Sequence, residues 1–222
     1  TQLSTLSALS PLDGRYASKT DALRPWLSEA AFMRQRVRVE VHWLIALSQA
    51  KLPDFPSFSA AAEKVLLALV ENFSDADAER IKAIEAVTNH DVKAVEYWMK
   101  EKVAGHTELE KASEFIHFAC TSEDINNTSH GLMLTGARQE VILPKLKEVL
   151  NALTAIALNN ASVPMLSRTH GQPASPTTLG KEMANIAKRL ERAITNIEKV
   201  SFLGKMNGAV GNYNAHLSAY PD

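Results

Sequence analysis

The chain has 222 residues, a formal net charge of −1 and 45% hydrophobic residues. This length and composition suffice for the core of one large domain or two small ones, and the nearly neutral charge excludes a global basic field that would attract nucleic acid. No stretch approaches the roughly 20 apolar residues of a membrane-spanning helix, and the start of the chain lacks the pattern of a signal peptide. Cys120 is the only cysteine, so no internal disulfide can form. These features predict a soluble cytoplasmic protein without a membrane partner.

The first predicted helix follows Pro25 and ends near Lys51, before Pro53. Its segment Arg36–Trp43 alternates polar and apolar residues, as a strand does, but it also fits a helical stripe. No turn residue interrupts the sequence from Ser28 to Lys51, and a strand of that length would be far longer than strands usually are. The pattern therefore favours a helix.

Three shorter helices are predicted next. The first covers roughly residues 60–73, Ser74 is expected to cap the second, and Asp91 is expected to cap the third. The segment Gly105-His106-Thr107 then forms a linker.

Two longer helices are predicted in the second half. Residues 142–159 carry apolar side chains at helical spacing, and a second helix is expected to begin at Pro176, with Ser175 as its N-cap. Along this second helix, apolar residues from Leu179 to Val200 recur at alternating steps of four and three. Such a heptad seam predicts lengthwise packing against other helices.

These patterns predict an all-α fold with a small N-terminal helical domain over residues 1–110. Residues 111–222 are expected to begin a bundle of long helices. The chain ends soon after the glycine-rich segment 204–212, without further helices to cover the seam. We therefore expect the sequence to be truncated.

Four short polar clusters interrupt this helical background. The first contains Arg15 beside Tyr16 in a turn, which offers a planar fork for phosphate or carboxylate together with an aromatic surface. An N-terminal arm that packs on the body of the protein is the alternative.

The second and third clusters, residues 88–93 and 120–130, lie where helices are expected to begin. Their polar side chains and backbone amides suit either a helix cap or an anion-binding site. Both interpretations stay open on the sequence alone.

The fourth cluster, Leu166–Pro176, contains Arg168, Thr169, His170 and Gln172 between two long apolar segments. A histidine held in a stiff turn among hydrogen-bonding neighbours is a candidate general acid or base, because its pKa is readily moved across neutrality. A structural histidine is the alternative.

No metal site is expected. Glu114 and His117 are three residues apart, a spacing compatible with metal ligation on a helix, but no second pair of suitable spacing accompanies them. The sequence also lacks a nucleophile elbow of the Gly-x-Ser-x-Gly type.

Together the clusters resemble the motifs of the fumarase/aspartase superfamily. Ser167–Pro176 is similar to its Thr-His loop, and Thr121–Asn127 is similar to another anion-binding segment. Asp13–Tyr16, Thr88–Lys93 and Gly208–Asn214 resemble the branch that cleaves adenylosuccinate to AMP and fumarate, in particular its bacterial form. The resemblance covers essentially the whole chain.

The resemblance implies a carbon–nitrogen lyase of purine biosynthesis that acts by β-elimination and needs no metal or organic cofactor. Its small-molecule substrates would be adenylosuccinate and the succinyl-carboxamide ribonucleotide of the same pathway. His170 would be the general acid that protonates the departing nitrogen, and a homotetramer would combine several subunits at each site. The residues expected to contact the nucleotide are Arg15, Tyr16, Asn89, His90 and Asp91, and those expected to hold the substrate near its succinyl carboxylates are Thr121 and Ser122.

The sequence departs from the superfamily in length. Members are longer, and this chain lacks their mobile loop Gly-Ser-Ser-x-x-Met-Pro-x-Lys-x-Asn-Pro, which supplies the serine general base. We therefore expect no measurable turnover by this chain alone. The alternatives are another lyase of the superfamily, such as argininosuccinate lyase, and a non-enzymatic helical scaffold.

Overall fold

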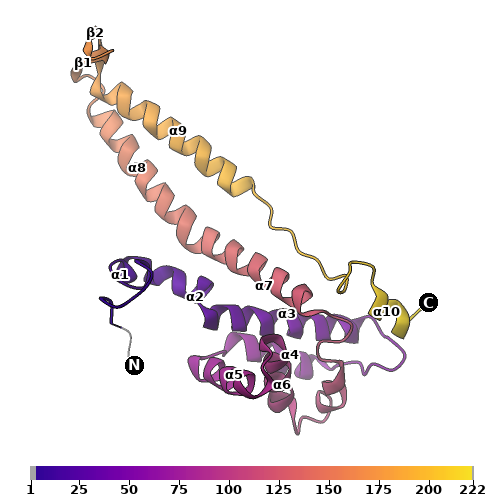
Figure 1. Cartoon of the computed structure of the whole chain (residues 1–222). Helices are drawn as coiled ribbons and strands as arrows, with labels where there is room; N and C mark the ends of the chain where they lie inside the picture. The colour runs from indigo at the N-terminus through magenta and orange to yellow at the C-terminus, as the bar shows by residue number, and fades with distance from the viewer. Residues whose placement is uncertain (1–3, 222) are drawn as a thin grey trace. The chain divides into compact units, whose positions relative to one another are not determined.

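The computed structural model describes residues 4–221, most of which are helical (Figure 1). The predicted all-α class is confirmed, and the strands within this part of the chain form a single two-stranded hairpin. The chain divides into two compact units. The first unit runs up to Thr135 and resumes at Leu203, and the second comprises Gly136–Phe202. The domain boundary predicted near residue 110 stays a prediction.

The first unit is built around the long helix α3 (Glu29–Gln49), which packs against α4, α5 and α6 (Figure 1). Val37, Val41 and Leu44 of α3 are buried in the core that these helices share. The other helical segments of this unit are α1 (Ala17–Thr20), η1 (Asp21–Leu23), α2 (Arg24–Leu27), α4 (Ala60–Glu71), α5 (Asp75–Thr88), α6 (Asp91–Val103), η2 (Glu110–Phe115), most of α7 (Ser122–Ala137) and α10 (Asn214–Ala219).

The predicted first helix is interrupted at Ser28. This residue has an extended backbone with ψ of 167°, and its hydroxyl accepts a hydrogen bond from the Ala31 N–H at 3.2 Å, so it caps α3 and separates it from α2. The alternating segment Arg36–Trp43 is helical, as predicted. Its pattern was ambiguous because residues around much of the circumference of α3 are buried, so no single apolar stripe forms.

The starts of α5 and α6 agree only in part with the prediction. Ser74 caps α5 as expected, in a capping box with Asp77. The predicted cap of α6 is wrong by one residue: His90 is the N-cap, and its ring Nδ1 accepts the Lys93 N–H at 3.1 Å. His90 takes the extended conformation that a cap requires, while Asp91 is the first helical residue.

The second unit is a helical hairpin in which α8 (Leu143–Asn159) and α9 (Leu179–Lys199) lie side by side (Figure 1). The π-helical turn η3 (Arg138–Ile142) precedes α8. Gly180 allows the first turn of α9 to approach the last turn of α8 closely, because a Cβ at this position would lie 2.4 Å from the carbonyl oxygen of Ala157. The helix predicted over residues 142–159 is confirmed.

The predicted start of α9 at Pro176 is wrong. Residues Pro164–Thr169 (β1) and Gln172–Thr178 (β2) form an antiparallel pair in which Leu166 lies opposite Pro176. Proline is tolerated in so short a ribbon because each strand is an edge strand. The helix begins only after Thr178, whose hydroxyl accepts the Lys181 N–H at 3.1 Å.

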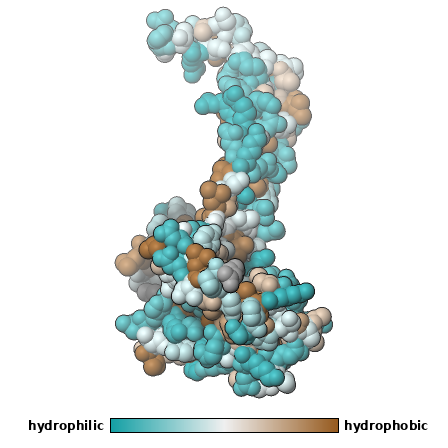
Figure 2. All heavy atoms as spheres, turned by 90° about the vertical axis from the view of Figure 1, so that its right-hand side faces the viewer, coloured by the Kyte–Doolittle hydropathy of each residue, from teal (hydrophilic) through white to brown (hydrophobic). Residues whose placement is uncertain are grey.

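The heptad seam of α9 is only partly covered within its unit. Ala187 and Ile194 are buried, whereas Ile186 and Val200 are 46% and 51% exposed. Hydrophobic side chains therefore reach the surface of this unit, where Figure 2 shows brown atoms among hydrophilic ones. Among the described helices, none is both long enough and apolar enough to cross a membrane.

Candidate functional site

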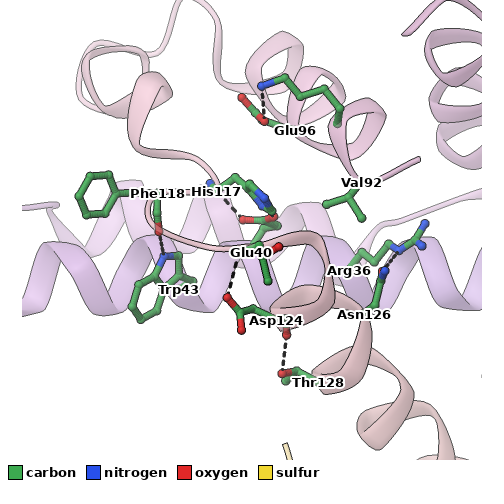
Figure 3. A network of polar contacts seen from close by, with 12 residues as sticks. Arg36, Glu40, Trp43, Val92, Glu96, His117, Phe118, Asp124, Asn126 and Thr128 are labelled. Atoms are coloured by element: carbon green, nitrogen blue, oxygen red, sulfur yellow. Dashed lines mark hydrogen bonds and ion pairs between the residues drawn. The ribbon is translucent and has the colours of Figure 1, made fainter. Parts of the chain in front are cut away.

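Three side chains on one face of α3 organise the polar contacts of the first unit. Arg36, Glu40 and Trp43 follow one another at helical spacing and face the segments that lead into α6 and α7 (Figure 3). Arg36 and Glu40 are buried although both are charged. Buried charges require partners, so the contacts of these two residues determine how the site is held.

Arg36 joins the second and third polar clusters. Its Nε donates to Asn126 Oδ1 at 2.9 Å, and its Nη2 forms an ion pair with Asp91. Burial disfavours the charged form of Asp91, but the guanidinium of Arg36 holds the pKa of this carboxyl below its ordinary value. The guanidinium also lies over the ring of Phe32, at 3.8 Å from its centroid, which adds a cation–π contact.

Glu40 holds the segment that leads into α7. Its carboxylate accepts the backbone N–H of His117 at 3.1 Å and contacts the ring Nδ1 of the same residue at 2.6 Å. Trp43 Nε1 donates to the carbonyl oxygen of Phe118 at 2.8 Å. His117 and Ala119 have positive φ values of 65° and 59°, a conformation that these contacts with α3 stabilise.

The ion pair between His117 and Glu40 predicts a pH-dependent stability. Burial disfavours the charged imidazole, but the hydrogen bond to Glu40 and the charge of Glu40 raise the pKa of His117 above its ordinary 6.5. The contribution of this ion pair to the free energy of unfolding is therefore fully present below pH 6.5 and is lost as the pH rises through the raised pKa. We expect His117→Gln to lower the free energy of unfolding by about 2 kcal/mol at acidic pH and by less at alkaline pH. Urea unfolding of both proteins across this pH range measures the difference, and a difference that grows with pH would contradict the assignment.

Asp124 anchors the start of α7 and is completely buried. Its carboxylate accepts the N–H of Thr121 at 2.9 Å and those of Asn207 and Gly208 at 3.2 and 3.1 Å, and it forms an ion pair with Lys205 at 2.7 Å. The side chain thus caps α7 and fixes the glycine-rich segment against it.

Asn127 forms a second tie to the same segment. Its amide donates to the carbonyl oxygen of Lys205 at 3.0 Å and its Oδ1 accepts the Lys205 N–H at 2.8 Å. Thr121 and the first helical residue, Ser122, are half-buried beside this arrangement. The α7 start therefore combines hydroxyls with a fixed backbone and the positive end of a helix dipole, which suits a carboxylate or phosphate.

The second cluster leaves side chains available for a ligand. Asn89 ends α5 in the left-handed conformation with φ of 52°, and both Asn89 and His90 are exposed. The ion pair between Arg36 and Asp91 holds this turn near Asn126. The structure thus brings the second and third clusters together, as a shared binding site requires.

The first cluster is exposed. The Arg15 guanidinium lies 5.7 Å from the ring centroid of Tyr16, which is 48% exposed. Within residues 4–221, no hydrogen bond joins either side chain to the second or third cluster. Their role as nucleotide contacts stays a prediction.

His170 belongs to the second unit, at the tip of the hairpin between β1 and β2. Thr169 pairs with Gln172, so His170 and Gly171 form a two-residue turn. Both have positive φ, 50° and 76°, as a type I′ turn requires. The predicted stiff turn is therefore a β-hairpin turn, and the imidazole is exposed at its end.

The weak metal candidate of the sequence is not supported. Glu114 and His117 do not share a helix, because η2 ends at Phe115. The part of the chain that the structure describes contains no cluster of three or more histidine, cysteine, aspartate or glutamate residues suited to a metal ion.

The sequence analysis did not identify the residues whose hydrogen bonds and ion pairs position the polar clusters. Arg36, Glu40, Asp124 and Lys205 make the ties described above, but none was a candidate. A usable signal existed for α3, because Arg36 and Glu40 share the helix face of the apolar Trp43. Charged residues on a buried face are expected to be paired.

The whole of this arrangement lies in a segment that is similar to known lyases. A family model described as "Lyase" matches residues 14–221. Adenylosuccinate lyase of Haemophilus influenzae is 59% identical over 222 residues, which are 100% of this chain and 49% of the relative. The enzyme of the same name from Escherichia coli K12 is 56% identical, over 100% of this chain and 49% of the relative. The chain thus spans about half the length of the curated relatives it matches.

Solved structures support the fold. Fumarate lyase from Mesorhizobium sp. BNC1 superposes with a TM-score of 0.69 at 24% identity, over 88% of this chain and 44% of that structure. The 3-carboxy-cis,cis-muconate lactonizing enzyme from Pseudomonas putida gives a TM-score of 0.68 at 22% identity, over 89% and 44% of the two chains. The family match extends over nearly the whole chain, so the chain belongs to this lyase family and, as its motifs indicate, to the fumarase/aspartase superfamily.

Proposed function

We propose that the complete protein cleaves adenylosuccinate to AMP and fumarate by β-elimination, and acts likewise on the succinyl-carboxamide ribonucleotide. A base removes a proton from the succinyl carbon next to a carboxylate, the carbon–nitrogen bond breaks, and His170 protonates the departing nitrogen. No residue of this chain is assigned as the base. Thr121 and Ser122 hold the succinyl carboxylates, while Arg15, Tyr16, Asn89, His90 and Asp91 contact the nucleotide.

The tie between the second and third clusters through Arg36 carries the proposal. It places an exposed polar turn close to the positive end of α7. Proton removal beside a carboxylate develops a second negative charge on an anionic group, which requires such preorganised donors. An exposed imidazole at the end of a stiff hairpin can reach a leaving group, whereas an imidazole sealed in apolar packing cannot. The names of the relatives support the same substrate.

We further propose a homotetramer in the cytoplasm. The partly exposed seam of α9, with Ile186 and Val200 at the surface, supports burial of this helix against further helices of the same or other subunits. The single cysteine supports a reducing compartment.

A comparison of substrates tests the reaction. The complete protein is supplied with adenylosuccinate or with argininosuccinate, and fumarate is measured. We expect release from adenylosuccinate only, with AMP as a competitive inhibitor and arginine without effect. A preference for argininosuccinate would identify another lyase of the superfamily, and release from neither would favour the scaffold.

A further inference from the structure

We propose that Arg36 is a positioning residue, which sets the placement of the turn Asn89–Asp91 relative to the start of α7 for binding the nucleotide substrate. This inference rests on the proposed function and deepens it, because it names the side chain that makes two separate clusters into one binding site. Arg36 itself is buried and touches no ligand in this assignment.

The contacts of Arg36 run in two directions. Nε donates to Asn126 on α7, and Nη2 pairs with Asp91 at the start of α6. The Arg36 side chain is only 6% exposed, whereas that of Asp91 is 46% exposed. A buried guanidinium is thus held in the core and reaches outward to a carboxylate at the surface. The ring of Phe32 covers the guanidinium and itself stacks on His130 of α7, with centroids 4.3 Å apart.

Neither helix start needs Arg36 as a cap. His90 accepts the Lys93 N–H and caps α6, and Asp124 accepts the Thr121 N–H and caps α7. What Arg36 adds is the connection between the two starts. A side chain required only for local helix formation would contact one of them.

The geometry of the guanidinium explains why an arginine occupies this position. Its planar fork donates along two fixed directions at once, whereas the ammonium of lysine is a compact charge on a flexible stem. Lysine at position 36 keeps the charge but cannot bridge Asp91 and Asn126 with the same geometry. The turn is then free to move relative to α7, and a ligand that contacts both binds more weakly. Protonation by His170 does not involve this bridge.

The test compares Arg36→Lys with Arg38→Lys in the complete protein. Arg38 lies on the same helix but is exposed, and its side chain makes no hydrogen bond within residues 4–221, so it is a matched control. We expect Arg36→Lys to raise the KM for adenylosuccinate and the Kd for AMP at least about tenfold, with kcat within about threefold of the parent. Arg38→Lys is expected to leave all three unchanged. An Arg36→Lys protein that matches the control in KM and Kd overturns the proposal, as does one that loses only kcat.

A second measurement does not depend on activity. Amide hydrogen exchange over residues 89–93 and 121–127 is expected to become faster in Arg36→Lys and to stay unchanged in Arg38→Lys. If the wild-type protein released no fumarate, the proposed function would fail, but this exchange result would still decide whether Arg36 ties the two segments. Unchanged exchange in both segments refutes the tie.

Asn126→Ala is a second variant that tests the same bridge if Arg36→Lys does not fold. It removes the partner on α7 and leaves the ion pair with Asp91 in place. We expect a rise in KM and in AMP Kd here too. Where both variants fold, the double variant should be no worse than Arg36→Lys alone, because residues of one network are not additive. Wild-type KM and Kd in Asn126→Ala, or full additivity, contradicts the assignment.

Discussion

Replacement of His170 by glutamine in the complete protein is expected to lower kcat for fumarate release by about 10²–10⁴-fold, the usual contribution of a positioned general acid. Glutamine can still donate a hydrogen bond to the departing nitrogen, but it cannot transfer a proton. The loss therefore reports proton transfer more than binding, and KM is expected to change little. The measurement is steady-state release of fumarate from adenylosuccinate.

The hairpin provides the reason to expect an intact fold. His170 occupies the first central position of the type I′ turn with φ of 50°, and its ring is exposed, so glutamine replaces it without losing buried contacts. Circular dichroism and thermal unfolding should match those of the parent. His106→Gln, at a histidine outside the four clusters, is the control and should keep full activity. Unimpaired activity of His170→Gln would remove this residue from the mechanism.

Asp124→Ala is expected to destabilise the chain by about 3 kcal/mol, because it leaves three backbone N–H groups and a lysine ammonium without their carboxylate. The affected donors are those of Thr121, Asn207, Gly208 and Lys205. The glycine-rich segment is expected to detach from α7, with faster amide exchange at Asn207 and Gly208. Urea unfolding measures the free energy. Glu123→Gln, at the exposed neighbour, is the control and should change it by less than about 0.5 kcal/mol.

The Asp124 carboxylate also predicts how the stability of the chain depends on pH in the acidic range. Burial disfavours the charged form of Asp124, but Lys205 and the backbone N–H groups hold its pKa below the ordinary 3.8. The stabilisation is therefore fully present above pH 3.8 and is lost as the pH falls through the lowered pKa. The difference in the free energy of unfolding between the parent and Asp124→Ala should stay constant near neutrality and become smaller in strong acid. A constant difference down to the lowest pH would show that charge plays no part.

The fold class and most helices could be predicted from local patterns. The cap at Ser74 and the helix over residues 142–159 follow from side-chain chemistry and from apolar spacing, which act within a few residues of the chain. The four polar clusters were also recognisable, because polar residues interrupt apolar helices there. The relatives that are similar over the whole of this chain are named adenylosuccinate lyase.

The two wrong helix starts have different physical causes. The local sequence around Pro176 favours the first turn of a helix, but pairing of β2 with β1 holds this residue in an extended strand, so a partner elsewhere in the chain overrides the local preference. At α6, His90 has the extended backbone and its ring accepts the Lys93 N–H, so His90 is the cap and Asp91 is the first helical residue. This second error is a choice between two neighbouring polar residues.

The sequence by itself determined that this chain is helical, that it carries the motifs of a lyase and that His170 lies in a stiff turn. Only the tertiary structure decided which buried charges hold the site. Arg36 meets Asn126, Glu40 meets His117, and Asp124 meets Lys205. These partners lie far apart along the chain. A buried charge is stable only beside a partner that folding brings to it, so no local sequence pattern identifies the pair.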